Sequence, residues 1–473
     1  MNRMLLLGVL VLALGMVAPA QAAPAIVPHR AAPAFPTVPP RVIPPARAAP
    51  PIGGRIPIGR APGFATAPNR PVHTPVLAYD PARGRLAVAW LSWGADLTDS
   101  YAAQVWVRVQ GAGGRWEDAQ TLNQLPVRAF FGGLALTWQP DGALVAAYGD
   151  GRGTVWLRER PASGGAWGAP ERLGSGQISA LLTDEAGALH ALLLSGRQVV
   201  QGLPRYGVRI PGDVWRWQAV PAGLSYNGQL ALATAPDGAL RRFVLVNDAT
   251  GTGHPLTLFR SDDGAAWTAL PMPLGCCLPR PERPTATSLL AARGPDGAGV
   301  VAVAWSQPAG PGPVAGGVFA AVSRDGGLSF GPEEVIAQHR ADGSFGDERG
   351  GRVGGFEPSL AYNRETHQLA VSWVEDDLDQ PGHATSASNR IVRTRLASRA
   401  LDPDADGWTY AMTPDSSDPL GPPVLSDWGI RGHLWGDAQG THAWLLAIDE
   451  RNMQSAIQLY PLDLPGLLVA VPS

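Results

Sequence analysis

The sequence predicts an all-β fold built from seven copies of one four-stranded unit. Apolar runs of four to eight residues alternate with turns rich in glycine and aspartate, and no stretch shows the 3.6-residue period of an amphipathic helix. The strand–turn–strand pattern recurs in copies that begin at Pro75, Gly133, Ile178, Gln229, Thr287, Pro358 and Gly432. Tryptophans follow the turns regularly: Trp116, Trp167, Trp217 and Trp267 are spaced by 51, 50 and 50 residues. Such an array predicts a seven-bladed β-propeller, with six blades as the alternative if one weak copy is an insertion.

Residues 1–22 have the features of a secretory signal peptide. Arg3 supplies the positive end, residues 5–17 form the apolar stretch, and Ala20-Gln21-Ala22 is a cleavage site of the A-x-A type. The apolar stretch is shorter than the roughly 20 residues that a membrane-spanning helix needs. We therefore expect a secreted or periplasmic protein, cleaved after about Ala22 and without a membrane span.

Residues 23–72 are rich in proline and alanine and contain six arginines but no acidic residue. This composition lacks the apolar content of a core and predicts a disordered, extended linker. The propeller domain is expected to occupy residues 73–473.

Charge differs sharply between these segments. All 40 acidic residues follow residue 72, whereas seven of the 37 basic residues, all arginines, precede it. The folded part therefore has a formal charge of about −10, which argues against nucleic acid as a partner.

The last repeat contains four expected strands. They are residues 431–435, 443–448, 455–460 and 464–471, each an apolar or β-branched run between turn residues. The final unit is therefore expected to be complete within the C-terminal part of the chain.

One turn carries the pattern Ser-x-Asp-x-Gly-x-x-aromatic, at Ser323, Asp325, Gly327 and Phe330. Short polar side chains of this kind accept hydrogen bonds from the backbone of their own turn, while glycine permits a positive φ. The aromatic ring is expected to pack against its sheet. A second copy over residues 260–267 has Arg260 in place of the serine, followed by Asp262, Gly264 and Trp267.

Acidic residues recur in the loops that would join the second and third strands of the units. Asp96, Asp150, Asp248, Glu375 and Asp376 belong to this set. In a propeller these loops open on one face, so the residues are candidates for binding a cation or a hydroxyl-rich ligand. The alternative interpretation is that they are ordinary turn residues.

The only two cysteines, Cys276 and Cys277, are adjacent and are followed by Arg280 on a loop of the same face. In an oxidising compartment they are expected to form a disulfide with each other. The loop would then act as a local stiffener or as part of a ligand-contact surface. A soft-metal site is a third reading, but two ligands are few for a metal.

Further binding candidates on this face are Arg349, Arg352, Glu357, Asp427 and Arg431, which lie in or beside long glycine-rich loops. Residues 402–407 begin like a calcium-binding loop, with Asp402, Asp404 and Asp406. Thr413 stands where the loop's last glutamate belongs. We therefore predict no metal site, with calcium as the weaker alternative.

The repeats, the export signal and the Ser-x-Asp-x-Gly-x-x-aromatic turn resemble the sialidase superfamily, in which this turn is the Asp-box. The resemblance covers most of residues 73–465, and Cys276-Cys277-x-Pro279 is similar to secreted sialidase-like proteins. Sialidases use three arginines to clamp a carboxylate, a tyrosine–glutamate nucleophile pair and an aspartate acid/base.

The catalytic residues of the family do not transfer to this sequence. The family's Arg-Ile-Pro should lead into the first inner strand, but His73 occupies that region. Arg55-Ile56-Pro57 lies earlier, in the expected linker, and Arg209-Ile210-Pro211 lies on an outer strand of the third unit. No tyrosine–glutamate pair can be assigned by spacing, so the catalytic residues remain unknown.

Three functions are compatible with these features. The first is a monomeric binding module for a glycan or for a protein or other partner in the cell envelope. The second is a divergent exo-glycosidase of the sialidase type that uses rim carboxylates. The third is a scaffold protein. A propeller fold does not choose among them.

Overall fold

The computed structural model describes the chain in segments, all within the compact unit formed by residues 46–473. These segments are residues 56–59, 72–93, 102–111, 114–123, 127–128, 133–195, 202–235, 238–248, 256–270, 287–294, 297, 299–307, 317–338, 358–377, 391–401, 408–411, 431–436, 443–449 and 456–462. Every element bounded in this part of the chain is a β-strand. No helix within these segments is long and apolar enough to cross a membrane.

The strands form seven antiparallel sheets, and the first three contain β2 to β14 in chain order. Sheet 1 has β2 (Val72–Asp80), β3 (Arg85–Trp93), β4 (Ala102–Val109) and β5 (Gln120–Thr121), with β6 (Val127–Arg128) also paired to β4. Sheet 2 has β7 (Leu134–Trp138), β8 (Leu144–Gly149), β9 (Thr154–Arg160) and β10 (Glu171–Ser175). Sheet 3 has β11 (Gln177–Thr183), β12 (Leu189–Ser195), β13 (Leu203–Arg209) and β14 (Arg216–Ala219).

The next three sheets repeat the same order. Sheet 4 has β15 (Ser225–Thr234), β16 (Leu240–Asp248), β17 (Leu256–Ser261) and β18 (Thr268–Leu270). Sheet 5 has β19 (Thr287–Arg293), β20 (Gly299–Gln307), β21 (Gly317–Ser323) and β22 (Glu334–Gln338). Sheet 6 has β23 (Ser359–Asn363), β24 (Gln368–Asp377), β25 (Ile391–Ala400) and β26 (Thr409–Ala411).

Sheet 7 combines both ends of the propeller sequence. It has β27 (Arg431–Gly436), β28 (Ala443–Asp449) and β29 (Ala456–Leu462), and its fourth strand is β1 (Ile56–Gly59). β1 pairs with β29 through Ile56 opposite Leu459 and Pro57 opposite Gln458. The expectation that the linker extends to residue 72 is therefore wrong at β1. A fourth strand over 464–471 was expected, but that stretch lies outside the described residues.

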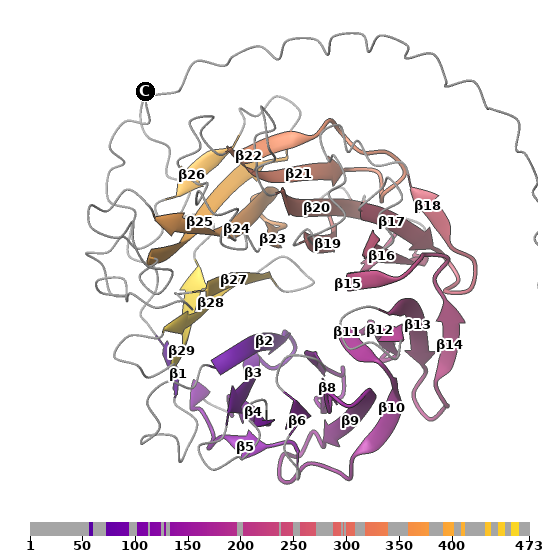
Figure 1. Cartoon of the computed structure of the whole chain (residues 1–473), viewed down its shortest axis with the longest axis vertical. Helices are drawn as coiled ribbons and strands as arrows, with labels where there is room; N and C mark the ends of the chain where they lie inside the picture. The colour runs from indigo at the N-terminus through magenta and orange to yellow at the C-terminus, as the bar shows by residue number, and fades with distance from the viewer. Residues whose placement is uncertain are drawn as a thin grey trace, which may run out of the picture. The chain divides into compact units, whose positions relative to one another are not determined.

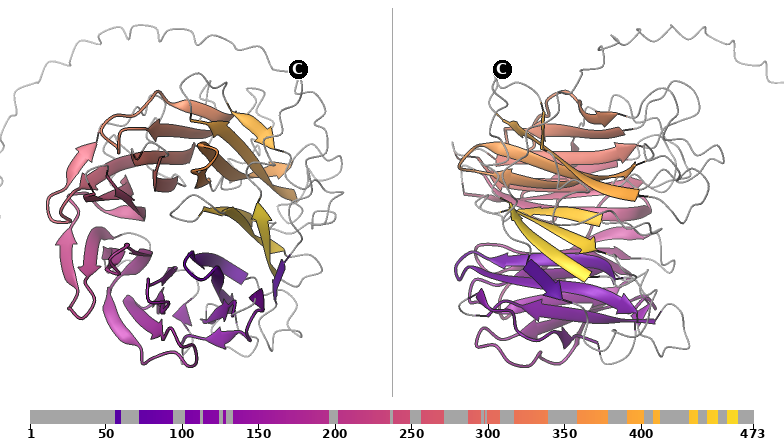
Figure 2. Two further views of the ribbon diagram at one scale, coloured as in Figure 1. Left: turned by 180° about the vertical axis from the view of Figure 1, so that it is seen from behind. Right: turned by 90° about the vertical axis from the view of Figure 1, so that its left-hand side faces the viewer.

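The sheets follow one another in a closed ring, as expected for a β-propeller (Figure 1; the left view of Figure 2 shows it from behind). The first strand of each sheet contacts the first strand of the next, from β2 through β7, β11, β15, β19 and β23 to β27. β2 also contacts β28 and β29 of sheet 7, which closes the circle. The first strands are thus innermost, and the prediction of an all-β propeller is confirmed.

The core lies between neighbouring sheets rather than within any one sheet. Among the described residues, six hydrophobic clusters join sheets 1–2, 2–3, 3–4, 4–5, 5–6 and 7–1. The inner strands of each sheet are covered on both faces by the neighbouring sheets, so successive residues along them are buried. All residues of β7 and β8, for example, are buried. Leucine, alanine and valine are the commonest apolar residues of the first two strands of the sheets, as expected for strands that are packed on both faces.

The regularly spaced tryptophans anchor the outer parts of the sheets to these clusters. Trp116, Trp167, Trp217 and Trp267 each pack against a different cluster. The repeat interval seen in the sequence therefore reflects one aromatic anchor per sheet.

The turn after β21 has the hydrogen bonds that its sequence predicts. The Ser323 hydroxyl donates to Asp325 (2.6 Å) and accepts from the Gly327 amide (2.8 Å). Asp325 accepts from the amides of Leu328 (3.0 Å) and Ser329 (2.9 Å). Gly327 has a φ of 81°, and the Phe330 ring packs against the cluster between sheets 4 and 5.

The matching turn after β17 is built one residue later than expected. Ser261 and Asp263 perform the two side-chain roles: the Gly264 amide donates to the Ser261 hydroxyl, and the amides of Ala265 and Ala266 donate to Asp263 (all 2.8 Å). Asp262 makes none of these bonds, so its assignment to the turn is wrong. Gly264 (φ 79°) and Trp267 hold their predicted places.

Candidate functional site

The antiparallel order of each sheet defines two faces. The face where the second strands end and the first strands begin is called the 2–3 face. The opposite face, where the first strands end and the second strands begin, is called the 1–2 face. The 1–2 turns of neighbouring sheets meet: Arg83 donates to the Asp141 carbonyl, and Gly187 lies against Pro140. Sheets 1 to 3 thus have their 1–2 turns at the same end.

The backbone places five of the sequence-predicted binding residues on the 2–3 face. Asp150 directly follows β8, Asp248 ends β16, Glu375 and Asp376 lie at the end of β24, and Arg431 begins β27. The other predicted candidates lie outside the described residues, namely Asp96, Cys276, Cys277, Arg280, Arg349, Arg352, Glu357 and Asp427.

Among the acidic residues of the 2–3 face, Asp150 is the one whose side-chain contacts are described, and these contacts stabilise its own turn. Its Oδ1 atom accepts hydrogen bonds from the backbone amides of Arg152 (2.7 Å) and Thr154 (2.9 Å). At this position the turn-residue interpretation accounts for the carboxylate.

A polar network that the sequence did not reveal lies between sheets 3 and 4. His190 and Tyr206 are fully buried, and the Tyr206 hydroxyl lies 2.5 Å from Nδ1 of His190. Nε of Arg242 donates to the same hydroxyl (2.9 Å), and Nε2 of His190 lies 3.0 Å from Asp184.

The donors in this network can be assigned because guanidinium only donates. The Tyr206 oxygen accepts from Arg242. The Asp184 carboxylate accepts a hydrogen bond from Nε2–H of His190, so in a neutral ring Nδ1 is the acceptor and the Tyr206 hydroxyl donates to it. Burial lowers the pKa of His190 despite this carboxylate, which agrees with a neutral ring.

The network is suited to holding sheets together and not to nucleophilic catalysis. Burial raises the pKa of Tyr206 to about 12, although Arg242 opposes the shift, so the phenol stays protonated at neutral pH. Burial also raises the pKa of Tyr148, whose hydroxyl donates to the Leu122 carbonyl (3.4 Å). Neither phenol contacts a glutamate in the described part of the chain.

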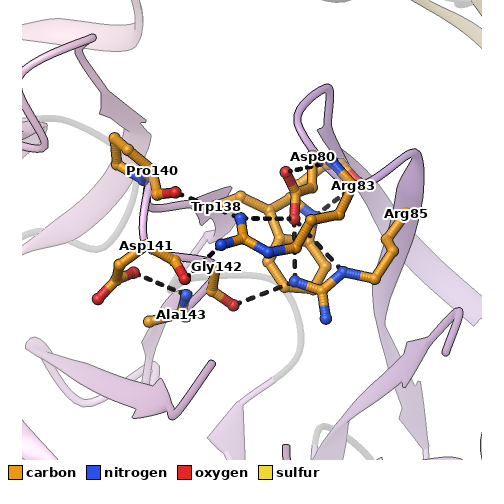
Figure 3. Close-up of polar contacts among 9 residues, drawn as sticks. Asp80, Arg83, Arg85, Trp138, Pro140, Asp141, Gly142 and Ala143 are labelled. Carbon is orange, nitrogen blue, oxygen red and sulfur yellow. Dashed lines mark hydrogen bonds and ion pairs between the residues drawn. The ribbon is translucent and has the colours of Figure 1, made fainter. Parts of the chain in front are cut away.

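A second network joins the 1–2 turns of sheets 1 and 2 (Figure 3). Buried Asp80 accepts from Arg85 (2.9 Å) and from the backbone amide of Arg83 (3.2 Å). The two guanidinium groups also donate to three backbone carbonyls of the next turn, at Pro140, Asp141 and Gly142. We call this arrangement the sheet 1–2 clasp.

Residues of both Arg-Ile-Pro sequences lie in β-strands, while Arg55 lies outside the described residues. Ile56 and Pro57 belong to the outermost strand of sheet 7. Arg209 ends β13, forms an ion pair with Glu171 (2.9 Å) and lies over the Trp215 ring, 5.3 Å from its centroid. The prediction of an outer strand is confirmed for Arg209, and Ile210 and Pro211 follow the end of that strand.

Metal ligands do not gather in the described segments: no group of three or more His, Cys, Asp or Glu side chains there could hold an ion. The calcium-like stretch 402–407 lies outside those segments.

No family model and no curated protein matches the sequence. Among solved structures, the chain is similar to the Hadza microbial sialidase Hz136, with 13% identity over 64% of this chain and 63% of that one and a TM-score of 0.42. It is similar to AofleA from Arthrobotrys oligospora, with 11% identity, coverage of 74% and 91%, and a TM-score of 0.41. It is also similar to YCF48 bound to D1 peptide, with 12% identity, coverage of 88% and 98%, and a TM-score of 0.44. The chain spans less than two thirds of the Hadza sialidase, and its fold assignment rests on its own strand order and contacts.

Proposed function

We propose that this chain is an exported binding protein whose propeller recognises a glycan or another cell-envelope component at the 2–3 face. The observation that carries the proposal is the recurrence of acids where second strands end. Asp248, Asp377 and Asp449 are the last residues of β16, β24 and β28.

The chemistry of such a rim favours a ligand rich in hydroxyl groups. Carboxylates accept hydrogen bonds from hydroxyls, and charge-assisted bonds of this kind are stronger than neutral ones. The negative charge of the folded part disfavours polyanions. The export signal would bring the protein into contact with envelope glycans.

At Tyr206, the contacts of the phenol favour a binding function over sialidase-type hydrolysis. Tyr206 is held protonated between His190 and Arg242. A nucleophilic tyrosine needs a carboxylate base at its hydroxyl instead.

The test is binding of the purified chain to a glycan array and to purified cell-wall material. Replacing Asp376 and Asp377 by arginine is expected to weaken binding about tenfold or more, since it reverses charge at the rim. Glu365→Arg is the matched control: this exposed residue lies in the 1–2 turn of the same sheet, at the opposite end, and its replacement should leave binding unchanged.

The glycosidase alternative is tested with fluorogenic glycosides, including sialosides. Turnover that is abolished by Glu375→Gln or Asp427→Asn would overturn the binding proposal. Unchanged glycan binding in the Asp376/Asp377 variant would also contradict it.

A further inference from the structure

Two arginines and one aspartate share a face of sheet 4 near the 1–2 face. Arg260 pairs with Phe243, and Arg242 with Ser261, across β16 and β17. Because side chains alternate along strands, Arg241, Arg260 and Asp262 lie on the same side as Phe243. This side meets sheet 5, where Arg241 donates to the Gly326 carbonyl at 3.5 Å.

The guanidinium groups of Arg241 and Arg260 have few hydrogen-bond acceptors among the described residues. Nε of Arg241 and Nε of Arg260 each lie 3.7 Å from the same oxygen of Asp262, beyond hydrogen-bond distance. Nη1 of Arg260 is buried and has no hydrogen-bond partner among the residues that the structure describes. The arginine side chains are only 18% and 19% exposed, whereas Asp262 is 58% exposed, so the pair opens to solvent beside Asp262.

The sheet 1–2 clasp shows what a satisfied arginine pair looks like in the same fold. There, Asp80 is buried and lies 2.9 Å from Arg85, and three backbone carbonyls accept from the two guanidiniums. Within the described segments, Arg241 and Arg260 have one carbonyl contact of 3.5 Å and one distant, exposed carboxylate. Arg242 does not compensate, because it is bonded to Tyr206 and to the carbonyls of Leu240 and Asp262.

We propose that Arg241 and Arg260 form a binding site for a phosphate or sulfate group. The two guanidiniums exceed Asp262 by one positive charge. The planar carboxylate of Asp262 is too distant to bond either Nε, whereas a tetrahedral oxyanion presents oxygens in several directions and can bridge two guanidiniums. This site lies at the other end of sheet 4 from Asp248 and is independent of the proposed glycan site.

The experiment is isothermal titration of the full chain with inorganic phosphate, inorganic sulfate, glucose 6-phosphate and glucose 6-sulfate, with glucose as the blank. Arg241→Gln and Arg260→Lys are each expected to raise Kd about tenfold, since each removes charge-assisted hydrogen bonds. Asp262→Asn is expected to lower Kd about fivefold, because it removes a negative charge beside the anion.

Arg324→Gln is the control variant, since this exposed arginine lies on the adjacent turn of sheet 5 and should leave Kd unchanged. Binding of the sugar esters as well as the free ions would assign the site to a group carried on a glycan, and binding of the free ions alone to inorganic anions. Both results support an oxyanion site.

The proposal is overturned if none of the four anions binds, if Asp262→Asn weakens binding, or if Arg324→Gln weakens it as much as Arg241→Gln. Circular dichroism establishes that each variant is folded. Asp262→Asn changes only an exposed side chain, so it keeps the test decisive even where an arginine variant fails to fold.

Discussion

Gly133 directly precedes β7 of sheet 2 and lies against Ile178 of β11, the first strand of sheet 3. Its φ of 70° is in the left-handed region, and a Cβ added there would overlap the backbone carbonyl oxygen of Ile178. Gly84, in the 1–2 turn of sheet 1, also has a positive φ (60°), but a Cβ there would meet nothing within 4 Å. An alanine at Gly84 would thus meet backbone strain alone, whereas an alanine at Gly133 would meet both backbone strain and a steric clash.

Gly133→Ala is therefore expected to lower the free energy of unfolding by about 3 kcal/mol, from backbone strain plus overpacking. Gly84→Ala should cost about 1 kcal/mol, from strain alone. Urea unfolding of both variants provides the measurement. Equal losses would show that the contact with Ile178 does not limit the approach of the sheets.

At this scale the sequence predicts the chemistry of the turns better than their register. The Ser-x-Asp-x-Gly pattern correctly predicts the bonds of Ser323 and Asp325. In the second copy, Asp262 and Asp263 are adjacent and the two halves of the pattern disagree: the Asp-x-Gly spacing to Gly264 selects Asp262, whereas the Ser-x-Asp spacing from Ser261 selects Asp263. The choice depends on Ser261, which is buried and directed at the Gly264 amide.

Pairs of turns hold neighbouring sheets together, and Asp80 is central to the first such contact. It is 3% exposed and forms ion pairs with Arg83 and Arg85. Trp138 completes the contact, since its ring lies 4.5 Å from the Arg85 guanidinium and its Nε1 donates to the Ala78 carbonyl.

Asp80→Ala is expected to destabilise the fold by about 3 kcal/mol, because it leaves two arginines without their buried carboxylate. Glu171→Ala is the comparison: it removes the exposed partner of Arg209 and should change the stability by less than about 0.5 kcal/mol. Chemical denaturation measures both. A small effect of Asp80→Ala would show that the carbonyl contacts alone maintain the clasp.

The buried His190 is expected to make stability depend on pH. Burial lowers its pKa in the folded state below the ordinary value of 6.5. The unfolded chain then binds more protons, so the free energy of unfolding falls as pH drops through about 6.5 and continues to fall toward the lower folded-state pKa.

His190→Gln should reduce the slope of stability against pH in this window, as measured by thermal unfolding at pH 5 to 8. It should also lower stability at pH 8, because Tyr206 loses its acceptor. A slope equal to that of the unmodified chain would contradict the buried neutral ring.

The sheet-to-sheet networks could not be predicted from the sequence because their members are distant in the chain. Arg242 lies 36 residues from Tyr206, and Arg83 lies 58 residues from Asp141. Only the placement of the strands brings them together.

The sequence predicts the ring as a whole through its periodic apolar strands, and its strand order has one exception. In sheet 7 the fourth strand is β1, residues 56–59, which pairs with β29 although the two strands are far apart in the chain. A four-residue strand in a proline-rich stretch carries too weak a pattern to predict. For the candidate site, the backbone brings Asp150, Asp248, Glu375, Asp376 and Arg431 to one face, while the roles of the remaining candidates stay predictions.

β1 completes sheet 7 at its outer edge and so joins the N-terminal part of the chain to the last sheet of the ring. The most direct test compares the thermal unfolding of two truncated chains, 46–473 and 61–473, with that of residues 23–473. The chain 46–473 keeps β1 and should unfold at the same Tm in a single transition. The chain 61–473 lacks β1 and leaves β29 as an open edge, so its Tm should fall by about 5 °C or more. Equal Tm values for the two truncated chains would contradict closure of the propeller by the N-terminal strand.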